Sequence, residues 1–266
     1  MRLLLSFLTR DVYEETSYKL SFLLGLASVF FNAFTFFFLS QAFGSQAAPA
    51  LEQYDTDYFS FVLIGLAFNA YFTVGLGGFA GGIRRAQTTG TLEAMMMTPT
   101  PLSMMVIGSA VWSYAYTTFR MVIYLGLGAM LGVSFAGANI LGALVSLVLA
   151  VITFASLGIM AAGVIMVIKR GDPITSIISY FALLLGGIYY PIEVLPDWLQ
   201  AIARLLPITH AINAMRAALL NGAGLAELRS SLLILGGFAV VLTPLALIVF
   251  RAAVEKAKSE GTLTHY

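Results

Sequence analysis

The sequence predicts an all-α integral membrane protein with six transmembrane helices, an interfacial helix at the amino terminus and a re-entrant helical hairpin before the last span. Composition is the first ground for this class: hydrophobic residues make up 59% of the 266 residues, and charged residues only 10%. The second is a mean hydropathy of +0.91. Both lie outside the range of soluble domains. We expect residues 1–266 to form one transmembrane domain, because six spans of about 20 residues leave room for little else.

Charge and cysteine content exclude several classes of function. The formal net charge is +1, so nothing indicates nucleic acid as a partner. The chain has no cysteine, which excludes disulfides, thiolate catalysis and cysteine-based metal sites. With two histidines, an ordinary zinc site is not expected either. We therefore expect neither a bound metal nor a catalytic site of this kind.

Six apolar runs are candidate spans. They cover residues 20–43, 58–82, 102–133, 140–168, 174–190 and 232–250. The fifth run is short. The first run is longer than the apolar region of a usual secretory signal and follows nineteen residues that carry several charges, so we expect it to be a retained span.

Lysine and arginine predict the orientation of these spans. With six spans, ten of the fourteen basic residues fall on one side. The loop at 44–57, on the other side, has no basic residue and three acids. The positive-inside rule then places both termini in the cytoplasm, in a multi-pass protein of the inner or plasma membrane of the cell.

Residues 1–19, MRLLLSFLTRDVYEETSYK, have the pattern of a helix lying in the membrane interface. Leucines and valine gather on one helical face, and Asp11, Glu14 and Glu15 would face water. A simple amphipathic lead-in to the first span is the alternative interpretation.

A short cytoplasmic helix is predicted within residues 84–100, between spans two and three. The run TLEAMMM contains good helix formers, follows Gly90 and ends before Thr98-Pro99, because a residue before proline avoids the helical region. Its three methionines are flexible apolar side chains suited to an adaptable contact surface, although they could equally dip into the headgroup region.

Two strings resemble the permease subunits of type-2 ATP-binding-cassette exporters. The first is GTLEAMMMTPTPLS, which is similar to the cytoplasmic helix of that family. The second starts at Gly-Gly, an aromatic residue and Pro191, and continues through LPDWLQ and LLPITHA to Arg216. Their order and spacing agree with the family along nearly the whole chain.

This resemblance implies a membrane subunit that pairs with a second copy or a close homologue and is driven by two ATPase subunits on separate chains. ATP and Mg would bind to those partners, and this chain has no GxxxxGK[ST] loop of its own. Family roles then place the ATPase-coupling helix at Gly90, Thr91, Leu92 and Glu93. Weaker contact candidates are Asp11, Glu14, Glu15 and Asp172.

Residues 191–222 are too polar and too broken to cross the bilayer as one helix. Pro196 and Asp197 suit a first helical turn, so 196–206 is predicted as one short helix, stopped by Pro207. A second helix is predicted over 208–220, closed by Asn221-Gly222. Irregular backbone at membrane depth must be surrounded by protein or line a cavity, which a hairpin re-entering from the outer surface would satisfy. We interpret this segment as an outer gate.

The candidate gate residues are polar, aromatic or proline side chains of this segment. They are Pro191, Pro196, Trp198, Pro207, Thr209, His210, Asn213 and Arg216. Trp198 is expected at headgroup level, and His210 as a hydrogen-bonded residue rather than a proton relay.

Arg120 is the only basic residue well inside a predicted span. Burying it costs a few kcal/mol on insertion scales, so it should face protein, water or a carboxylate rather than lipid. A structural ion pair is the first expectation, and a place in the transport pathway the second.

The function expected from the resemblance is ATP-driven export of a hydrophobic or amphiphilic substrate, such as a lipid, a lipid-linked glycan or a drug. The alternatives are an intramembrane enzyme, for which no paired catalytic groups are found, and a passive channel or scaffold, for which no polar stripe or filter repeat is visible.

Overall fold

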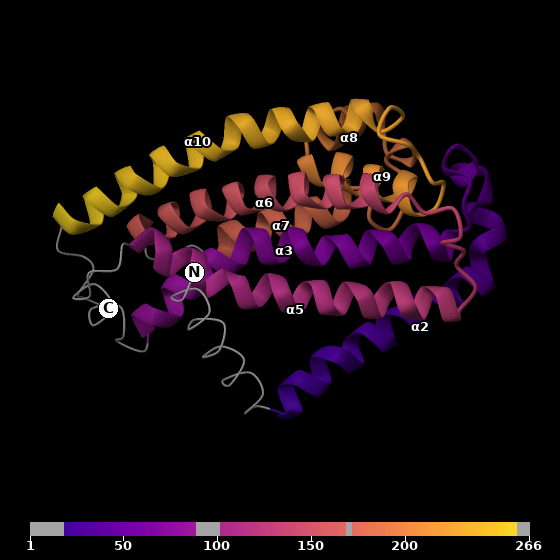
Figure 1. Cartoon of the computed structure of the whole chain (residues 1–266), viewed down its shortest axis with the longest axis horizontal. Coiled ribbons are helices and arrows are strands. Elements are labelled where there is room, and N and C mark those ends of the chain that lie inside the picture. Colours follow the sequence, from indigo (N-terminus) through magenta and orange to yellow (C-terminus); the bar gives the residue numbers. More distant parts are fainter. Residues whose placement is uncertain (1–18, 89–101, 169–171, 260–266) are drawn as a thin grey trace.

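A computed structural model describes residues 19–88, 102–168 and 172–259. Within these ranges the regular secondary structure is helical, without strands. Figure 1 shows α3, α5, α6 and α10 running lengthwise beside one another, with α2 crossing obliquely and α8 and α9 gathered at one end. The helices are α2 (Lys19–Leu51), α3 (Tyr58–Thr88), α5 (Leu102–Met130), α6 (Ile140–Ile168), α7 (Asp172–Leu185), α8 (Asp197–Arg204), α9 (Pro207–Leu219) and α10 (Arg229–Ser259), with short 3₁₀ turns η1 (Glu52–Tyr54) and η2 (Ile192–Val194).

Each of the six apolar runs forms a helix, and the class predicted from composition is confirmed as all-α. Among the described residues, α2, α3, α6 and α10 are long and apolar enough to cross a membrane by length and composition. Helix α7 is apolar but has only 14 residues. The predicted interfacial helix at 1–19 and the short helix within 84–100 lie largely outside the described residues and stay predictions.

Two predicted boundaries at the α9 end of the bundle are wrong. Helix α2 continues to Leu51 instead of ending at 43, because the alanine-rich run after Gly44 suits a helix as well as a loop. Helix α7 ends at Leu185 rather than near 190. The chain turns at Gly187, whose φ of +72° is a left-handed conformation that glycine adopts without strain.

Asparagine and aspartate side chains fix the starts of two long helices. Asp57 precedes α3 and accepts a hydrogen bond from the backbone N–H of Ser60 at 3.1 Å. Asn139 precedes α6, and its Oδ1 accepts from the N–H of Gly142 at 2.9 Å. Such caps satisfy N–H groups that have no partner within the helix.

Helix α6 lies between α3 and α10 and packs against both, most extensively against α10. At their crossing, a Cβ added to Gly158 would collide with the carbonyl oxygen of Gly75, so the two backbones meet without an intervening side chain. Next to the crossing, the rings of Phe72 and Phe154 pack edge to face with centroids 5.1 Å apart. The contact makes α3 and α6 the central pair of the bundle.

Helix α5 packs on another side of α3, and α2 packs against both. The hydroxyl of Tyr71 on α3 donates to Thr118 Oγ1 on α5 at 2.9 Å. The ring of Phe37 on α2 meets that of Phe59 on α3 edge to face, with centroids 5.4 Å apart. The remaining surface of α2 exposes many large apolar side chains, as a helix in contact with lipid would.

Candidate functional site: the α8–α9 segment and two arginines

Helices α8 and α9 confirm the two short helices expected between the last two apolar runs. Helix α8 begins at Asp197 after Pro196, and α9 begins at Pro207, each within two residues of the prediction. Proline in the first turn costs no hydrogen bond, because the N–H at that position has no helical partner. The chain leaves α9 at Gly222, whose φ is +66°.

Helix α9 is enclosed by the protein. It packs against α3, α6 and α10. The apolar face expected from the sequence is buried: the side chains of Ile208, Ala211, Ile212, Met215 and Leu219 all belong to the buried core. A helix with so much buried surface is part of the bundle rather than a surface loop.

Arg216 lies at the centre of this enclosed region, with 2% of its surface exposed. Its Nε and Nη2 donate to the carbonyl oxygen of Phe61 at 3.1 and 2.9 Å, and Nη2 also donates to the carbonyl of Ile188 at 3.2 Å. The guanidinium carbon lies 3.3 Å from the centroid of the Phe61 ring. Nη1 is buried without a hydrogen-bond partner. The charge is therefore held by carbonyl dipoles and an aromatic face.

Glycine makes this arrangement possible. A Cβ on Gly65 of α3 would collide with the carbonyl oxygen of Ile188 and lie 2.9 Å from Nη2 of Arg216. The missing side chain lets the segment after α7 and the guanidinium approach the α3 backbone together.

Polar contacts extend from Arg216 to the turn between α2 and α3. The hydroxyl of Tyr54 donates to a carboxylate oxygen of Glu193 at 3.2 Å, and Asn221 Nδ2 donates to the carbonyl of Tyr54 at 3.1 Å. The Tyr54 ring packs edge to face on Phe61. We call the set Tyr54, Phe61, Ile188, Glu193, Arg216 and Asn221 the Arg216 clasp. It joins η1, α3, the segment after α7, η2 and α9.

The turn between α8 and α9 is held by side chains that bond to backbone carbonyls. Thr209 Oγ1 donates to the carbonyl of Ala203 at 2.8 Å, and Thr209 is buried. His210 Nε2 lies 2.8 Å from the carbonyl oxygen of Arg204, which confirms that His210 is hydrogen-bonded. Trp198 is 67% exposed, as a residue at a membrane–water interface can be.

The other candidate gate residues occupy different environments. Pro191 is buried before η2, and Asn213 is half-buried on α9. Thr209 and Arg216 do not line an open passage within this chain, since both are buried and bonded to carbonyls. Their role in gating stays a prediction.

Arg120 is half-buried on α5 and faces α2. Nη2 donates to Ser28 Oγ at 3.3 Å, and the guanidinium carbon lies 6.0 Å from the centroid of the Tyr116 ring. Its Nε is buried with no partner. The expected ion pair is not found among the described residues, because no acidic side chain faces it from the packed helices.

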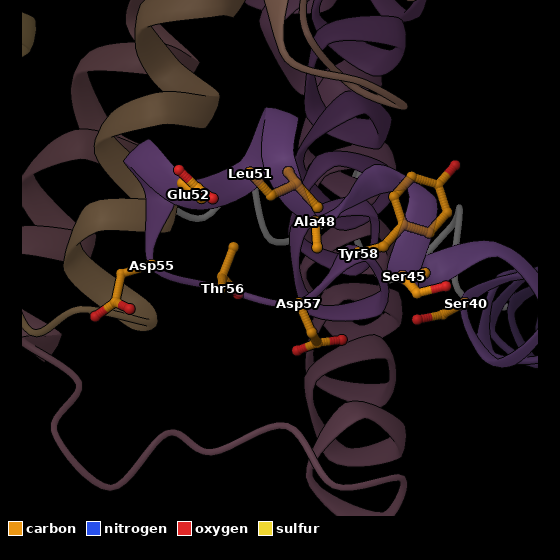
Figure 2. Close-up of a pocket in the computed structure, with 10 residues that line it drawn as sticks. Ser40, Ser45, Ala48, Leu51, Glu52, Asp55, Thr56, Asp57 and Tyr58 are labelled. Atoms are coloured by element: carbon orange, nitrogen blue, oxygen red, sulfur yellow. The ribbon is translucent and has the colours of Figure 1, made fainter.

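Beside η1 the surface is hollowed into a cavity of about 700 Å³. The residues lining it include the acids Glu52, Asp55 and Asp57 (Figure 2). In Figure 2 their carboxylates lie apart rather than around one point, and Asp57 also caps α3. Across the described part of the chain, no three His, Asp or Glu side chains come together as a metal site would need.

All but one of the predicted ATPase contacts lie outside the described residues. Gly90, Thr91, Leu92 and Glu93 fall between α3 and α5, and Asp11, Glu14 and Glu15 fall before α2, all outside the described residues. Asp172 is the first residue of α7. These assignments stay predictions.

Several residues that organise the site were not singled out from the sequence. Tyr54, Glu193 and Asn139 are polar residues near breaks in the apolar pattern, and only that position could have pointed to them. Asn139 joins α6 to the segment after α9, since its Nδ2 donates to the carbonyl of Ala223 at 3.0 Å. Phe61 holds Arg216 through its carbonyl, a group that every residue carries, and through its ring, one of many aromatic rings in the apolar runs, so no sequence signal singles it out.

Comparison with known proteins confirms the expected family. No curated protein matches the chain. The family model described as ABC-2 type transporter matches residues 12–220, which include both arginines, the α8–α9 segment and the string GTLEAMMMTPTPLS. The match covers well over half of the sequence, and the apolar helices agree with a multi-pass membrane protein. The chain belongs to the ABC-2 type transporter family, as the membrane subunit of an ATP-binding-cassette transporter.

Proposed function

We propose that the chain is the permease of an ATP-driven exporter that moves a hydrophobic or amphiphilic substrate, such as a lipid, lipid-linked glycan or drug, out of the cytoplasm or inner leaflet. Two copies, or one copy and a close homologue, would form the membrane part. Two cassette ATPases would bind at the cytoplasmic face and hydrolyse ATP with Mg. Helices α2, α3, α5, α6, α7 and α10 would be the six spans, with both termini in the cytoplasm.

The course of α3 is the observation that best supports this proposal. One end of α3 leads into the segment 89–101, which contains Gly90 and Glu93. Its other end supplies Phe61, whose carbonyl and ring hold Arg216 of α9. Phe61 and Thr88 are 27 residues apart, which is about 40 Å along a helix. A single helix thus joins the predicted ATPase contact to the α8–α9 segment.

A mechanism follows from this connection. Closure of the two ATPases would shift segment 89–101, and α3 would carry the shift to the Arg216 clasp. The α8–α9 segment, re-entering from the outer side, would then move between closed and open arrangements. Binding of ATP would change the populations of the two arrangements only through contacts that differ between them.

Topology is the first test. A reporter fused after Tyr266 should report cytoplasm, and one inserted near Gln46 should report the outside, because basic residues concentrate on one side of the spans. Reversed signals would refute the orientation and, with it, the cytoplasmic position of Glu93.

Coupling is the second test. The substitution Glu93→Arg should leave the chain inserted in the membrane but weaken co-purification with its ATPase or uncouple hydrolysis from transport. The control is Arg229→Gln, an exposed charge change at the start of α10. Normal transport by the Glu93→Arg variant would exclude segment 89–101 as the contact and favour a channel or scaffold.

A further inference from the structure

Arg120 is a cation without a counter-ion in the described part of the chain. It lies on α5 against α2, near Ser28, Tyr116 and Tyr124. Ser28 Oγ donates its own proton to the carbonyl of Gly25 at 2.7 Å, so it accepts from Arg120. Nε is buried with no hydrogen-bond partner. The guanidinium therefore retains donor capacity that the protein does not use.

Acidic side chains are absent at this depth in every packed helix. Helices α2, α3, α5 and α6 contain no Asp or Glu between their ends. The first acid after Ser28 in the sequence is Glu52, 24 residues and about 36 Å away along a helix, and Glu15, 13 residues before Ser28, lies outside the described residues. A second copy of the chain would bring the same acid-free helices. Neither this chain nor its copy can neutralise Arg120 from these helices.

The depth of Arg120 in the membrane makes a charge without an acidic partner energetically unfavourable. Arg120 lies ten residues before the end of α5, about 15 Å along the helix axis. Its partner Ser28 lies nine residues after the start of α2, about 14 Å along that helix. In a hydrocarbon layer about 30 Å thick, the charge is near the middle. An ionisable residue at that depth is expected to face water or a ligand that interacts with it.

The surface around Arg120 is apolar and aromatic. On α2, Phe31, Phe34 and Phe38 are exposed, and on α5, Phe119 and Val122 are exposed. A hydrocarbon tail can lie along these side chains while its charged end meets the guanidinium. Arginine donors bind the oxygens of phosphate and carboxylate particularly well.

We propose that Arg120, with Ser28 and the neighbouring tyrosines, binds the oxyanion of an amphiphile, a phosphate or carboxylate carried on a hydrophobic tail, near the middle of the membrane. This inference rests on the proposed export function, and it narrows the substrate class to anionic amphiphiles. A cationic or neutral amphiphile would leave the guanidinium unpaired.

The test measures binding of radiolabelled dodecyl phosphate to the full chain in nanodiscs of zwitterionic phosphatidylcholine. The variants are Arg120→Gln, which removes the charge, and Arg120→Lys, which keeps it and shows that the site still folds. The control is Arg229→Gln, an exposed arginine outside the site. We expect Arg120→Gln to raise the Kd about tenfold or more, the loss of a charge-assisted hydrogen bond, while Arg120→Lys retains most of the affinity and the control all of it.

Competitors separate the possible sources of the anion. Dodecyl trimethylammonium, which carries the opposite charge, should not compete. Inorganic phosphate should compete only weakly, because it has no tail. Equal affinity for inorganic phosphate would overturn the amphiphile assignment. Phosphatidylglycerol added to the nanodiscs should displace dodecyl phosphate if a resident lipid headgroup occupies the site, and an undisplaced probe would point to transported substrate; either result supports the oxyanion site.

Two results would overturn the site itself. Wild-type affinity in the Arg120→Gln variant is one. The other is a double variant, Arg120→Glu with Glu15→Arg, that regains the stability lost in the Arg120→Glu variant, because this would identify an internal ion pair.

The proposed function fails separately: if dodecyl phosphate binds but no cassette ATPase associates with the chain, the site stands and export does not. Coupled ATPase activity without binding of the probe would leave export intact and exclude the site.

Discussion

The substitution Gly65→Ala tests how tightly the Arg216 clasp holds α3 against the segment after α7. The added Cβ would collide with the carbonyl of Ile188 and lie 2.9 Å from Nη2 of Arg216. One of these groups must move, and either movement disturbs the hydrogen bonds of the buried guanidinium. Overpacking of this kind costs about 1–3 kcal/mol.

Gly77→Ala is the matched control, because a Cβ at Gly77 of the same helix meets no heavy atom within 4 Å. Both substitutions gain the same helix propensity, about 1 kcal/mol, so their difference isolates the collision. At about 2–4 °C per kcal/mol for a domain near this size, Gly65→Ala should melt roughly 2–12 °C below Gly77→Ala. Size-exclusion chromatography of detergent-purified protein after stepwise heating measures this. Equal melting of the two variants would refute the close approach at Gly65.

Two further predictions concern the α9 end of the bundle. Asn139→Ala removes the cap at Gly142 and the bond to Ala223, so it should lower stability by about 1–2 kcal/mol; an unchanged melting temperature would mean that α6 and α9 are not joined there. Single cysteines can be introduced without background, because the chain has none. A cysteine at Asp197 should react quickly with an impermeant thiol reagent from outside, and one at Ile212 slowly, since Asp197 is exposed and Ile212 is fully buried. Equal labelling of both would indicate an ordinary surface loop.

The helices were predictable because the features that define them, long apolar runs and prolines, belong to the local sequence. Pro196 and Pro207 alone divide the segment before α10 into two helices, and the structure divides it within two residues of the same positions. The end of α2 was not predictable from hydropathy, because the residues after Gly44 are compatible with both helix and loop.

The environment of the two arginines depends on contacts between distant parts of the chain. Arg216 binds carbonyls that lie 155 and 28 residues away, and a carbonyl acceptor leaves no mark in the sequence. For Arg120 the sequence correctly indicated a costly charge inside a span. The expected ion pair is not found among the described residues. The sequence shows that the neighbouring apolar runs contain no acid, but the contacts of Arg120 with Ser28 and Tyr116 become apparent only in the folded arrangement.

The backbone contact between Gly75 and Gly158 gives α3 a natural fulcrum. From Gly75, the helix extends 13 residues to Thr88 and 14 residues to Phe61, so the two arms are each about 20 Å long. A rigid rod that tilts about this crossing is a lever of equal arms. A displacement of one ångström at the end next to segment 89–101 would then appear as about one ångström in the opposite direction at Phe61. A movement caused by the proposed ATPase partners would thus be reversed in direction by α3 and not amplified.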